Sequence, residues 1–212
     1  MNPSTPVLAG LYAITDGTLT PGVQLMPAVE AAIRGGARLV QYRDKSSDTT
    51  RRRQEARTLA GLCRDHGAGF IVNDDVELTL ESGADGVHLG RDDVALATAR
   101  VRLGPRALIG VSCYDSLERA VAAAHAGADY VAFGSFHASA TKPGTVRAPL
   151  GLLTEARRQL GIQVCAIGGI TPDNGAVLLA AGAHMLAAIR GVFAEKDVRV
   201  AAENYARLFK PR

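Results

Sequence analysis

The chain has 212 residues, which is enough to bury a full core and falls near the lower end of the range for a (β/α)8 barrel. Hydrophobic residues make up 47% and charged residues 21%, a globular composition that excludes disordered, fibrous and disulfide-rich classes. The formal net charge is only +3, so bulk charge gives no reason to expect nucleic acid or a membrane surface as partner.

Short apolar runs of strand length alternate with longer segments of helical periodicity along the whole chain. The predicted strands are residues 9–15, 39–41 with its continuation, 69–72, 86–89, 107–111, 130–133, 163–167 and 184–189. The predicted helices are residues 22–35, 49–66, 76–82, 94–103, 117–126, 150–160, 172–181 and 198–209.

Many of the helices are followed by a short glycine-containing motif of the form Gly-Ala-x, as at residues 83–85 and 127–129. Glycine supplies the left-handed backbone that a short turn from helix to strand needs. An open doubly wound sheet is the main alternative, but its Gly-x-Gly-x-x-Gly motif after the first strand is missing. The pattern therefore predicts an α/β fold, a (β/α)8 TIM barrel, with residues 1–212 as a single domain.

Polar residues follow the second predicted strand, where a βα barrel builds its site at the carboxyl ends of its strands. Gln41, Arg43 and Lys45 are two residues apart, so on an extended chain they share a face. Arginine and lysine there would form a positive patch suited to phosphate oxygens. A solvated charged loop is the alternative, and the same-face spacing favours the anion site.

Acidic residues follow the next two strands. Asn73, Asp74 and Asp75 come after the third, and Asp93 lies shortly after the fourth. Mg²⁺ takes one or two carboxylates together with substrate phosphate oxygens and water, which predicts a magnesium site at Asp74 and Asp93. Helix capping is the alternative for Asp75 and for Asp92 or Asp93, because each stands just before a helix.

The remaining strand ends carry hydroxyl groups and glycines. Ser112 follows the fifth strand, and no histidine is arranged beside it as in a serine nucleophile, while His88 and His137 are interpreted as structural hydrogen-bonding residues. The long loop after the sixth strand contributes Ser139, Thr141 and Lys142, and the last two strands contribute Gly169, Ile189 and Arg190. The loops after strands seven and eight are the usual phosphate site of this fold, so two anion-binding ends are predicted.

Taken in order, these segments resemble the thiamine phosphate synthase family over nearly the whole chain. The matching segments are residues 11–16, 41–45, 73–75, 86–90 with Asp93, 109–112, 127–131, 139–142 and 167–170. The resemblance implies a Mg²⁺-dependent transferase of thiamine biosynthesis. It would join hydroxymethylpyrimidine diphosphate to thiazole phosphate and release pyrophosphate.

The resemblance also assigns roles to residues. It implies that the pyrimidine diphosphate is held by Gln41, Arg43, Lys45, Asn73, Ser112 and Lys142. It implies that the thiazole phosphate is held by Ser139, Thr141, Gly169, Ile189 and Arg190. Asp74 and Asp93 would hold Mg²⁺, and the catalytic group would be Arg43, Lys45, Ser112 and Lys142.

The chain departs from the family pattern at four places, which are Arg91, Cys113–Tyr114, Ser139 and Arg190. Two other functions stay open, a thiazole tautomerase-like isomerase and a phosphate-binding barrel without turnover. Arg43, Lys45, the two aspartates and Lys142 favour the synthase over both.

The three cysteines, Cys63, Cys113 and Cys165, are expected to be buried free thiols. The sequence contains no signal peptide pattern and no apolar run of membrane-spanning length, which predicts a cytoplasmic protein. We expect small phosphorylated molecules as partners, and the sequence leaves homo-oligomer formation open.

Overall fold

Eight parallel strands close into a barrel in the order of the chain. The protein is described here by a computed structural model, which covers residues 6–138 and 147–210. The strands are β1 (Gly10–Ile14), β2 (Ala37–Tyr42), β3 (Gly69–Asn73), β4 (Gly86–Leu89), β5 (Leu108–Tyr114), β6 (Tyr130–Phe133), β7 (Gln163–Ile167) and β8 (Met185–Ala188). Strand β8 pairs in parallel with β1, which completes the ring and confirms the predicted (β/α)8 barrel.

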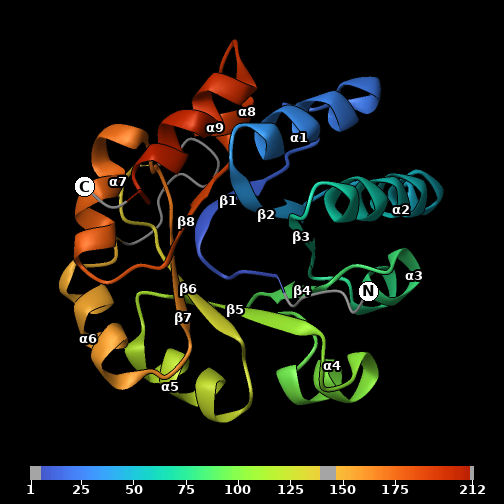
Figure 1. Cartoon of the computed structure of the whole chain (residues 1–212). Coiled ribbons are helices and arrows are strands. Elements are labelled where there is room, and N and C mark those ends of the chain that lie inside the picture. Colours follow the sequence, from blue (N-terminus) through green and yellow to red (C-terminus); the bar gives the residue numbers. More distant parts are fainter. Residues whose placement is uncertain (1–5, 139–146, 211–212) are drawn as a thin grey trace.

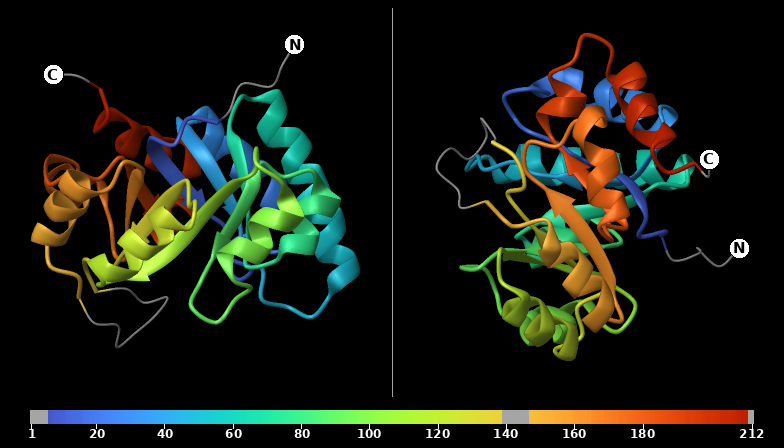
Figure 2. Two further views of the ribbon diagram at one scale, coloured as in Figure 1. Left: turned by 90° about the horizontal axis from the view of Figure 1, so that it is seen from below. Right: turned by 90° about the vertical axis from the view of Figure 1, so that its left-hand side faces the viewer.

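Helices surround this ring of strands (Figure 1). They are η1 (Gly22–Gln24), α1 (Leu25–Arg34), α2 (Thr49–Asp65), α3 (Val76–Ser82), α4 (Leu96–Leu103), α5 (Leu117–His125), α6 (Gly151–Gln159), α7 (Pro172–Ala180), α8 (Arg190–Phe193) and α9 (Val198–Arg207). The last helix, α9, packs beside α1 on the outside of the barrel (Figure 2).

Local signals in the sequence explain where helices begin and end. The side chain of Asp75 accepts a hydrogen bond from the backbone N–H of Leu78 and caps α3, so the capping interpretation was right for this residue. Gly83 ends the same helix with a φ of 69°, which a residue with a Cβ adopts only at a cost. Helix α4 has Ala95 at its N-cap, so neither Asp92 nor Asp93 caps it.

Alternating side chains along each strand build two apolar layers. On β1, Leu11 and Ala13 pack toward the surrounding helices, whereas Tyr12 and Ile14 point into the barrel. The inner cluster also holds Leu39, Ile71, Leu108, Tyr130 and Cys165, and fills the barrel below the carboxyl ends of the strands. The pocket described below therefore opens above a packed floor and not through a pore.

The bounds differ from the predicted ones mainly at two strands. Strand β5 continues to Tyr114, with an irregularity of register against β6 between Ser112 and Tyr114, so Ser112 lies within the strand. Strand β8 ends at Ala188, and Arg190 begins the short helix α8, which the sequence did not reveal. Ile189 continues the apolar run of the strand, so the pattern alone does not mark the turn that follows Ala188.

The three cysteines are buried free thiols, as predicted. Burial raises the pKa of Cys63 and of Cys113 to about 12, so both stay protonated and unreactive near neutral pH. In the described part of the chain, no helix is long and apolar enough to cross a membrane.

Candidate active site

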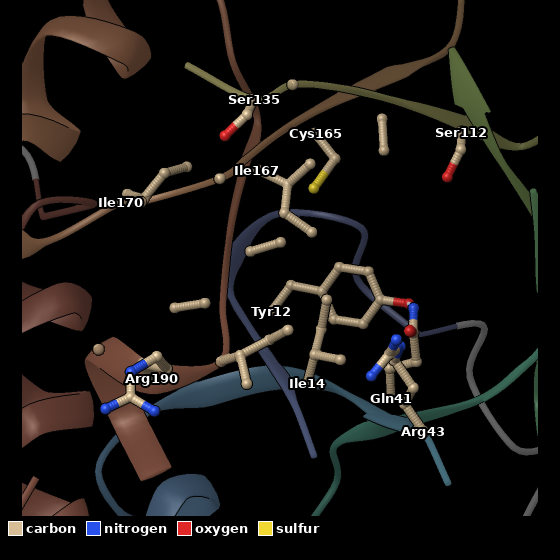
Figure 3. Close-up of a pocket in the computed structure, with 18 of the residues that line it drawn as sticks. Tyr12, Ile14, Gln41, Arg43, Ser112, Ser135, Cys165, Ile167, Ile170 and Arg190 are labelled. Atoms are coloured by element: carbon tan, nitrogen blue, oxygen red, sulfur yellow. The ribbon is translucent and has the colours of Figure 1, made fainter. Parts of the chain in front are cut away.

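A pocket of about 570 Å³ opens at the carboxyl ends of the strands. Seven of the residues predicted to bind substrate line it: Gln41, Arg43, Asn73, Ser112, Gly169, Ile189 and Arg190. Figure 3 shows Gln41 and Arg43 on one side and Arg190 on the opposite side, with Tyr12 and Ile14 between them. The structure thus brings together residues that are far apart in the sequence and places Arg43 and Arg190 at two separate ends of the pocket.

The basic end is anchored on β1 and β2. The backbone N–H of Arg43 donates to the hydroxyl of Thr15 at 2.9 Å, and the guanidinium of Arg43 lies 3.7 Å from the carboxylate of Asp16. Thr18 donates a hydrogen bond to Asp16 and, with the nearby positive charge of Arg43, lowers the pKa of Asp16, so Asp16 is ionised. Arg43 is therefore held at the mouth of the pocket by the segment that follows β1.

The acidic residues predicted to hold a metal lie at the rim of this basic end. Lys45 donates to the carboxylate of Asp74 at 2.5 Å, and the carboxyl groups of Asp74 and Asp93 hydrogen-bond to each other. The backbone N–H of Gly90 donates to Asp93 at 2.6 Å. None of Lys45, Asp74 and Asp93 lines the pocket itself, but Asp74 directly follows Asn73, which does.

The two carboxyl groups have opposite pKa shifts. Burial and the hydrogen bond with Asp74 raise the pKa of Asp93. For Asp74, burial acts to raise the pKa, but the hydrogen bonds with Lys45 and Asp93 outweigh it and lower the pKa. Two carboxylates in contact repel each other unless a proton or a cation lies between them.

This donor set fits a divalent cation that brings other ligands with it. Both groups supply the hard oxygen atoms that Mg²⁺ prefers, and the cation commonly takes only one or two protein carboxylates beside phosphate and water. Within the described residues, no group of three or more Cys, His, Asp and Glu side chains could hold a metal alone. Asp74 also has a φ of 65°, an unusual backbone for a residue other than glycine, and such conformations concentrate at functional sites.

The opposite end of the pocket is built mainly from backbone. Gly168 and Gly169 have φ values of 102° and 61°. A Cβ on Gly168 would lie 2.0 Å from the Ser135 hydroxyl, and one on Gly169 would lie 2.4 Å from the carbonyl oxygen of Ala138. Only glycine fits at both positions, and the missing side chains leave the peptide groups accessible to a ligand.

Helix α8 completes this end. Ile189 is its N-cap and Arg190 its first residue, so the two residues predicted at the end of a strand instead lie at a strand-to-helix turn. The loops after strands seven and eight, with the N-terminus of a short extra helix, are the common phosphate site of βα barrels. Ser139, Thr141 and Lys142, which were predicted to reach this pocket, lie outside the described residues.

A chain of hydrogen bonds crosses the floor of the pocket and was missed in the sequence. Gln41 Nε2 donates to the hydroxyl of Tyr12 at 2.7 Å, and that hydroxyl lies 2.9 Å from the hydroxyl of Tyr130. His88 contacts Tyr130 through Nδ1 at 3.0 Å and Ser112 through Nε2 at 2.9 Å, so it is a hydrogen-bonding residue as interpreted. The available signal was a tyrosine on the inward face of two apolar strands, because a buried phenol needs a polar partner.

Another contact at the mouth involves residues that depart from the family pattern. The guanidinium of Arg91 lies 4.7 Å from the centre of the Tyr114 ring, and that of Arg119 lies 5.7 Å from it. Both distances allow an attraction between the cation and the ring. Tyr114 lines the pocket, so these two contacts hold one wall of the mouth beside Asp93.

Known proteins resemble this chain over nearly its full length. It is 56% identical over 203 residues to a thiamine-phosphate synthase of Thioalkalivibrio sulfidiphilus, with 96% of both chains covered. It is 50% identical over 202 residues to a thiamine-phosphate synthase of Nitrosococcus oceani, with 95% of this chain and 93% of the relative covered.

The fold is also similar to that of a solved protein of this kind. A solved thiamine phosphate pyrophosphorylase from Pyrococcus furiosus superposes with a TM-score of 0.86 at 35% identity, covering 94% of this chain and 95% of that one. The pattern of the family described as thiamine monophosphate synthase matches residues 11–192. The chain therefore belongs to the thiamine monophosphate synthase family.

Proposed function

We propose that the protein is a Mg²⁺-dependent thiamine-phosphate synthase. It would join 4-amino-2-methyl-5-(diphosphooxymethyl)pyrimidine to thiazole phosphate and release pyrophosphate. The observation that carries this proposal is a single pocket with two chemically different ends. Arg43 and the edge formed by Lys45, Asp74 and Asp93 suit a diphosphate, whereas the glycine-rich turn at Gly168 and Gly169 suits a smaller phosphate.

The basic end would hold the diphosphate. Arg43 offers a planar fork that matches phosphate oxygens, and Lys45 offers a mobile ammonium group that is 62% exposed. Asp74 and Asp93 would hold Mg²⁺, which when bound neutralises charge on the leaving pyrophosphate. Lys45 now pairs with Asp74, so it already lies where the diphosphate and the cation would meet.

The apolar middle of the pocket would hold the two rings. Ile14, Ala132, Cys165 and Ile167 line it beside Tyr12, with the amide of Gln41 and the hydroxyl of Ser112 as polar groups at the floor. Such a wall excludes water from a reaction in which the carbon–oxygen bond to pyrophosphate breaks and a bond from the thiazole nitrogen forms. No side chain has to act as nucleophile.

At the other end, Gly169, Ile189 and Arg190 would hold the thiazole phosphate. Arg190 adds a guanidinium to a turn that otherwise offers peptide groups. From the family resemblance we assign Ser139 and Thr141 to this phosphate as well, and Lys142 to the diphosphate. Phosphates held at both ends would fix the distance between the two reacting atoms.

The two alternatives require less of this site. An isomerase acting on the thiazole, or a barrel that only binds a phosphate, has no use for paired carboxylates beside Arg43 and Lys45. The test is to incubate the purified protein with both substrates and Mg²⁺ and to measure pyrophosphate and thiamine phosphate. Equal amounts of both products, lost when Mg²⁺ is removed, are expected.

Three other outcomes would contradict the proposal in distinct ways. Failure to release pyrophosphate would exclude the synthase. Unchanged turnover after metal removal would exclude the role given to Mg²⁺. Interconversion of thiazole phosphate isomers without the pyrimidine diphosphate would support the isomerase instead.

A further inference from the structure

Five side chains from five strands form one unbroken series of hydrogen bonds across the floor of the pocket. The order is Gln41, Tyr12, Tyr130, His88 and Ser112, with contacts of 2.7, 2.9, 3.0 and 2.9 Å. We call this series the floor chain. Its first and last members, Gln41 and Ser112, both line the substrate pocket, whereas Tyr12 and Tyr130 are 1% and 0% exposed. Tyr130 also stacks on the ring of His88 and meets the ring of Tyr12 edge-on, which holds the hydroxyl groups in line.

We propose that the floor chain runs in one direction, from Gln41 to Ser112, and that it thereby makes the Ser112 hydroxyl a hydrogen-bond donor to the ligand. The direction has consequences because a phenol has only one proton to donate, and a neutral imidazole has one donor and one acceptor nitrogen. Each of the two tyrosines and the neutral imidazole can therefore donate to only one neighbour. The donor at one end sets the role of every group along the series.

The first contact sets the direction. An amide nitrogen can only donate, so Tyr12 accepts from Gln41 Nε2 and has its own proton left for Tyr130. If Tyr130 donated to Tyr12 instead, the Tyr12 proton would have no acceptor at a buried position, which is costly. Burial raises the pKa of both phenols, so each keeps its proton and takes part as a donor.

The donor and acceptor roles at the Ser112 end of the floor chain follow in turn. With its oxygen accepting from Tyr12, Tyr130 donates to His88 Nδ1. A ring nitrogen that accepts a hydrogen bond has no proton, so the imidazole proton is on Nε2, which donates to the Ser112 oxygen. The Ser112 proton remains for a ligand in the pocket, and at the far end the side-chain amide oxygen of Gln41 is available as an acceptor.

One donor at Ser112 and one acceptor at Gln41 complement a ring that carries an acceptor nitrogen as well as an amino group. Ser112 would donate to a ring nitrogen, and Gln41 would accept from an amino group. The match to the aminopyrimidine rests on the proposed function, whereas the direction of the floor chain does not. Tyr12, Tyr130 and His88 are then positioning residues, since they act through Gln41 and Ser112.

The direct test is the location of the proton on His88. Long-range ¹H–¹⁵N correlation spectra of the ligand-free protein distinguish a protonated ring nitrogen from an unprotonated one. His88→Gln identifies the signals among the five histidines. We expect Nε2 to be protonated and Nδ1 unprotonated. A proton on Nδ1, alone or together with one on Nε2, would overturn the proposed direction.

The second test removes one link. Tyr130→Phe takes away the donor to His88 Nδ1, so the tautomer is expected to become mixed and the KM for the pyrimidine diphosphate to rise about three- to tenfold, as for one lost neutral hydrogen bond. The KM for thiazole phosphate should change less. Tyr205→Phe is the matched control, because this buried hydroxyl donates to the Ile170 carbonyl and lies outside the floor chain. It should leave the His88 signals and the pyrimidine KM unchanged.

The coupling between Tyr130 and Ser112 is measured with Ser112→Ala. If Tyr130 acts through Ser112, adding Tyr130→Phe to Ser112→Ala should raise the pyrimidine KM little further. Fully additive effects would show that Tyr130 acts by another route. If Tyr130→Phe does not fold, the spectra of the unaltered protein still decide the direction. If the unaltered protein forms no product while His88 has the expected tautomer, the proposed function fails and the floor chain stands.

Discussion

The two ends of the pocket offer a ligand different chemistry. The end at β2 to β4 presents ionised side chains, with Arg43 beside Asp16 and Lys45 beside Asp74. The end at β7 and β8 presents mainly backbone, at Gly168 and Gly169, where a side chain would collide with Ser135 or Ala138. Charged side chains attract phosphate oxygens by electrostatics, whereas a glycine turn offers backbone groups in one fixed shape.

Different substitutions should therefore disable the two ends. At the charged end, removing a carboxylate changes the local charge and leaves the backbone intact. At the glycine end, adding a single methyl group changes the shape and leaves the charge intact. Three predictions follow from this contrast, from the largest expected effect to the smallest.

Asp93→Ala should lower turnover by about a hundredfold, because it removes a proposed metal ligand at the place where leaving-group charge develops. The fold should be unaffected, since Asp93 lies at the rim and caps no helix. The measurement is pyrophosphate release across a range of Mg²⁺ concentrations. Asp92→Ala, one residue away and exposed, is the control and should keep normal turnover. Normal turnover in Asp93→Ala would remove this residue from the site.

Gly168→Ala should weaken the thiazole phosphate end by about tenfold in KM and also destabilise the protein by about 1–3 kcal/mol, since the new Cβ is strained and meets Ser135. The KM for the pyrimidine diphosphate should change much less. Gly151→Ala is the control, because nothing lies within 4 Å of a Cβ there and the position is helical. A larger change in KM for the pyrimidine substrate would show that the two ends are not independent.

The smallest effect is expected at Asp44, which lies between Arg43 and Lys45 in the sequence. Asp44 accepts hydrogen bonds from the Ser46 N–H at 2.7 Å and from Arg51 at 2.6 Å. Burial acts to raise the pKa of Asp44, but these bonds outweigh it and lower the pKa. A carboxyl group whose pKa is lower in the folded state stabilises the fold above its unfolded pKa of about 3.9, and loses that contribution as the pH falls through the folded value.

Asp44→Asn should therefore cost about 1 kcal/mol at pH 7, and this difference from the unaltered protein should shrink as the pH is lowered below about 4. Urea unfolding at several pH values measures it. A difference that stays constant with pH would mean that the charge of Asp44 does not contribute. Asp48→Asn is a useful comparison, because Asp48 is the exposed N-cap residue of α2 and, like Asp44, forms an ion pair with Arg51.

Much of the fold could be read from local patterns. The strands at β4, β6 and β7 and the helix α3 begin and end where the apolar runs and the glycine after the helix predict. Strand β8 and helix α8 could not be separated in the same way. The residues from Met185 to Phe193 are almost all apolar, and the break between them comes from closure against β1 and β7, which is not a local property.

The site residues also divide into those that the sequence reveals and those that only the fold brings together. Gln41, Arg43 and Ser112 were found because polar side chains at the ends of apolar strands are easily recognised in the sequence. Tyr12 and Tyr130 were missed because each looks like an ordinary apolar strand residue. Their hydroxyl groups meet only because β1 and β6 face each other across the barrel, so their 2.9 Å contact has no counterpart in sequence spacing.

By itself the sequence determined the alternation of strands and helices, and with it the placement of the polar residues at one end of the barrel. These properties depend on neighbours a few residues away, so periodicity and turn residues are sufficient to predict them. Only the tertiary structure decided which polar groups touch: Lys45 with Asp74, Asp74 with Asp93, and the floor chain. Those contacts join residues brought together by barrel closure, and hydrogen bonding and pKa depend on distances that only closure sets.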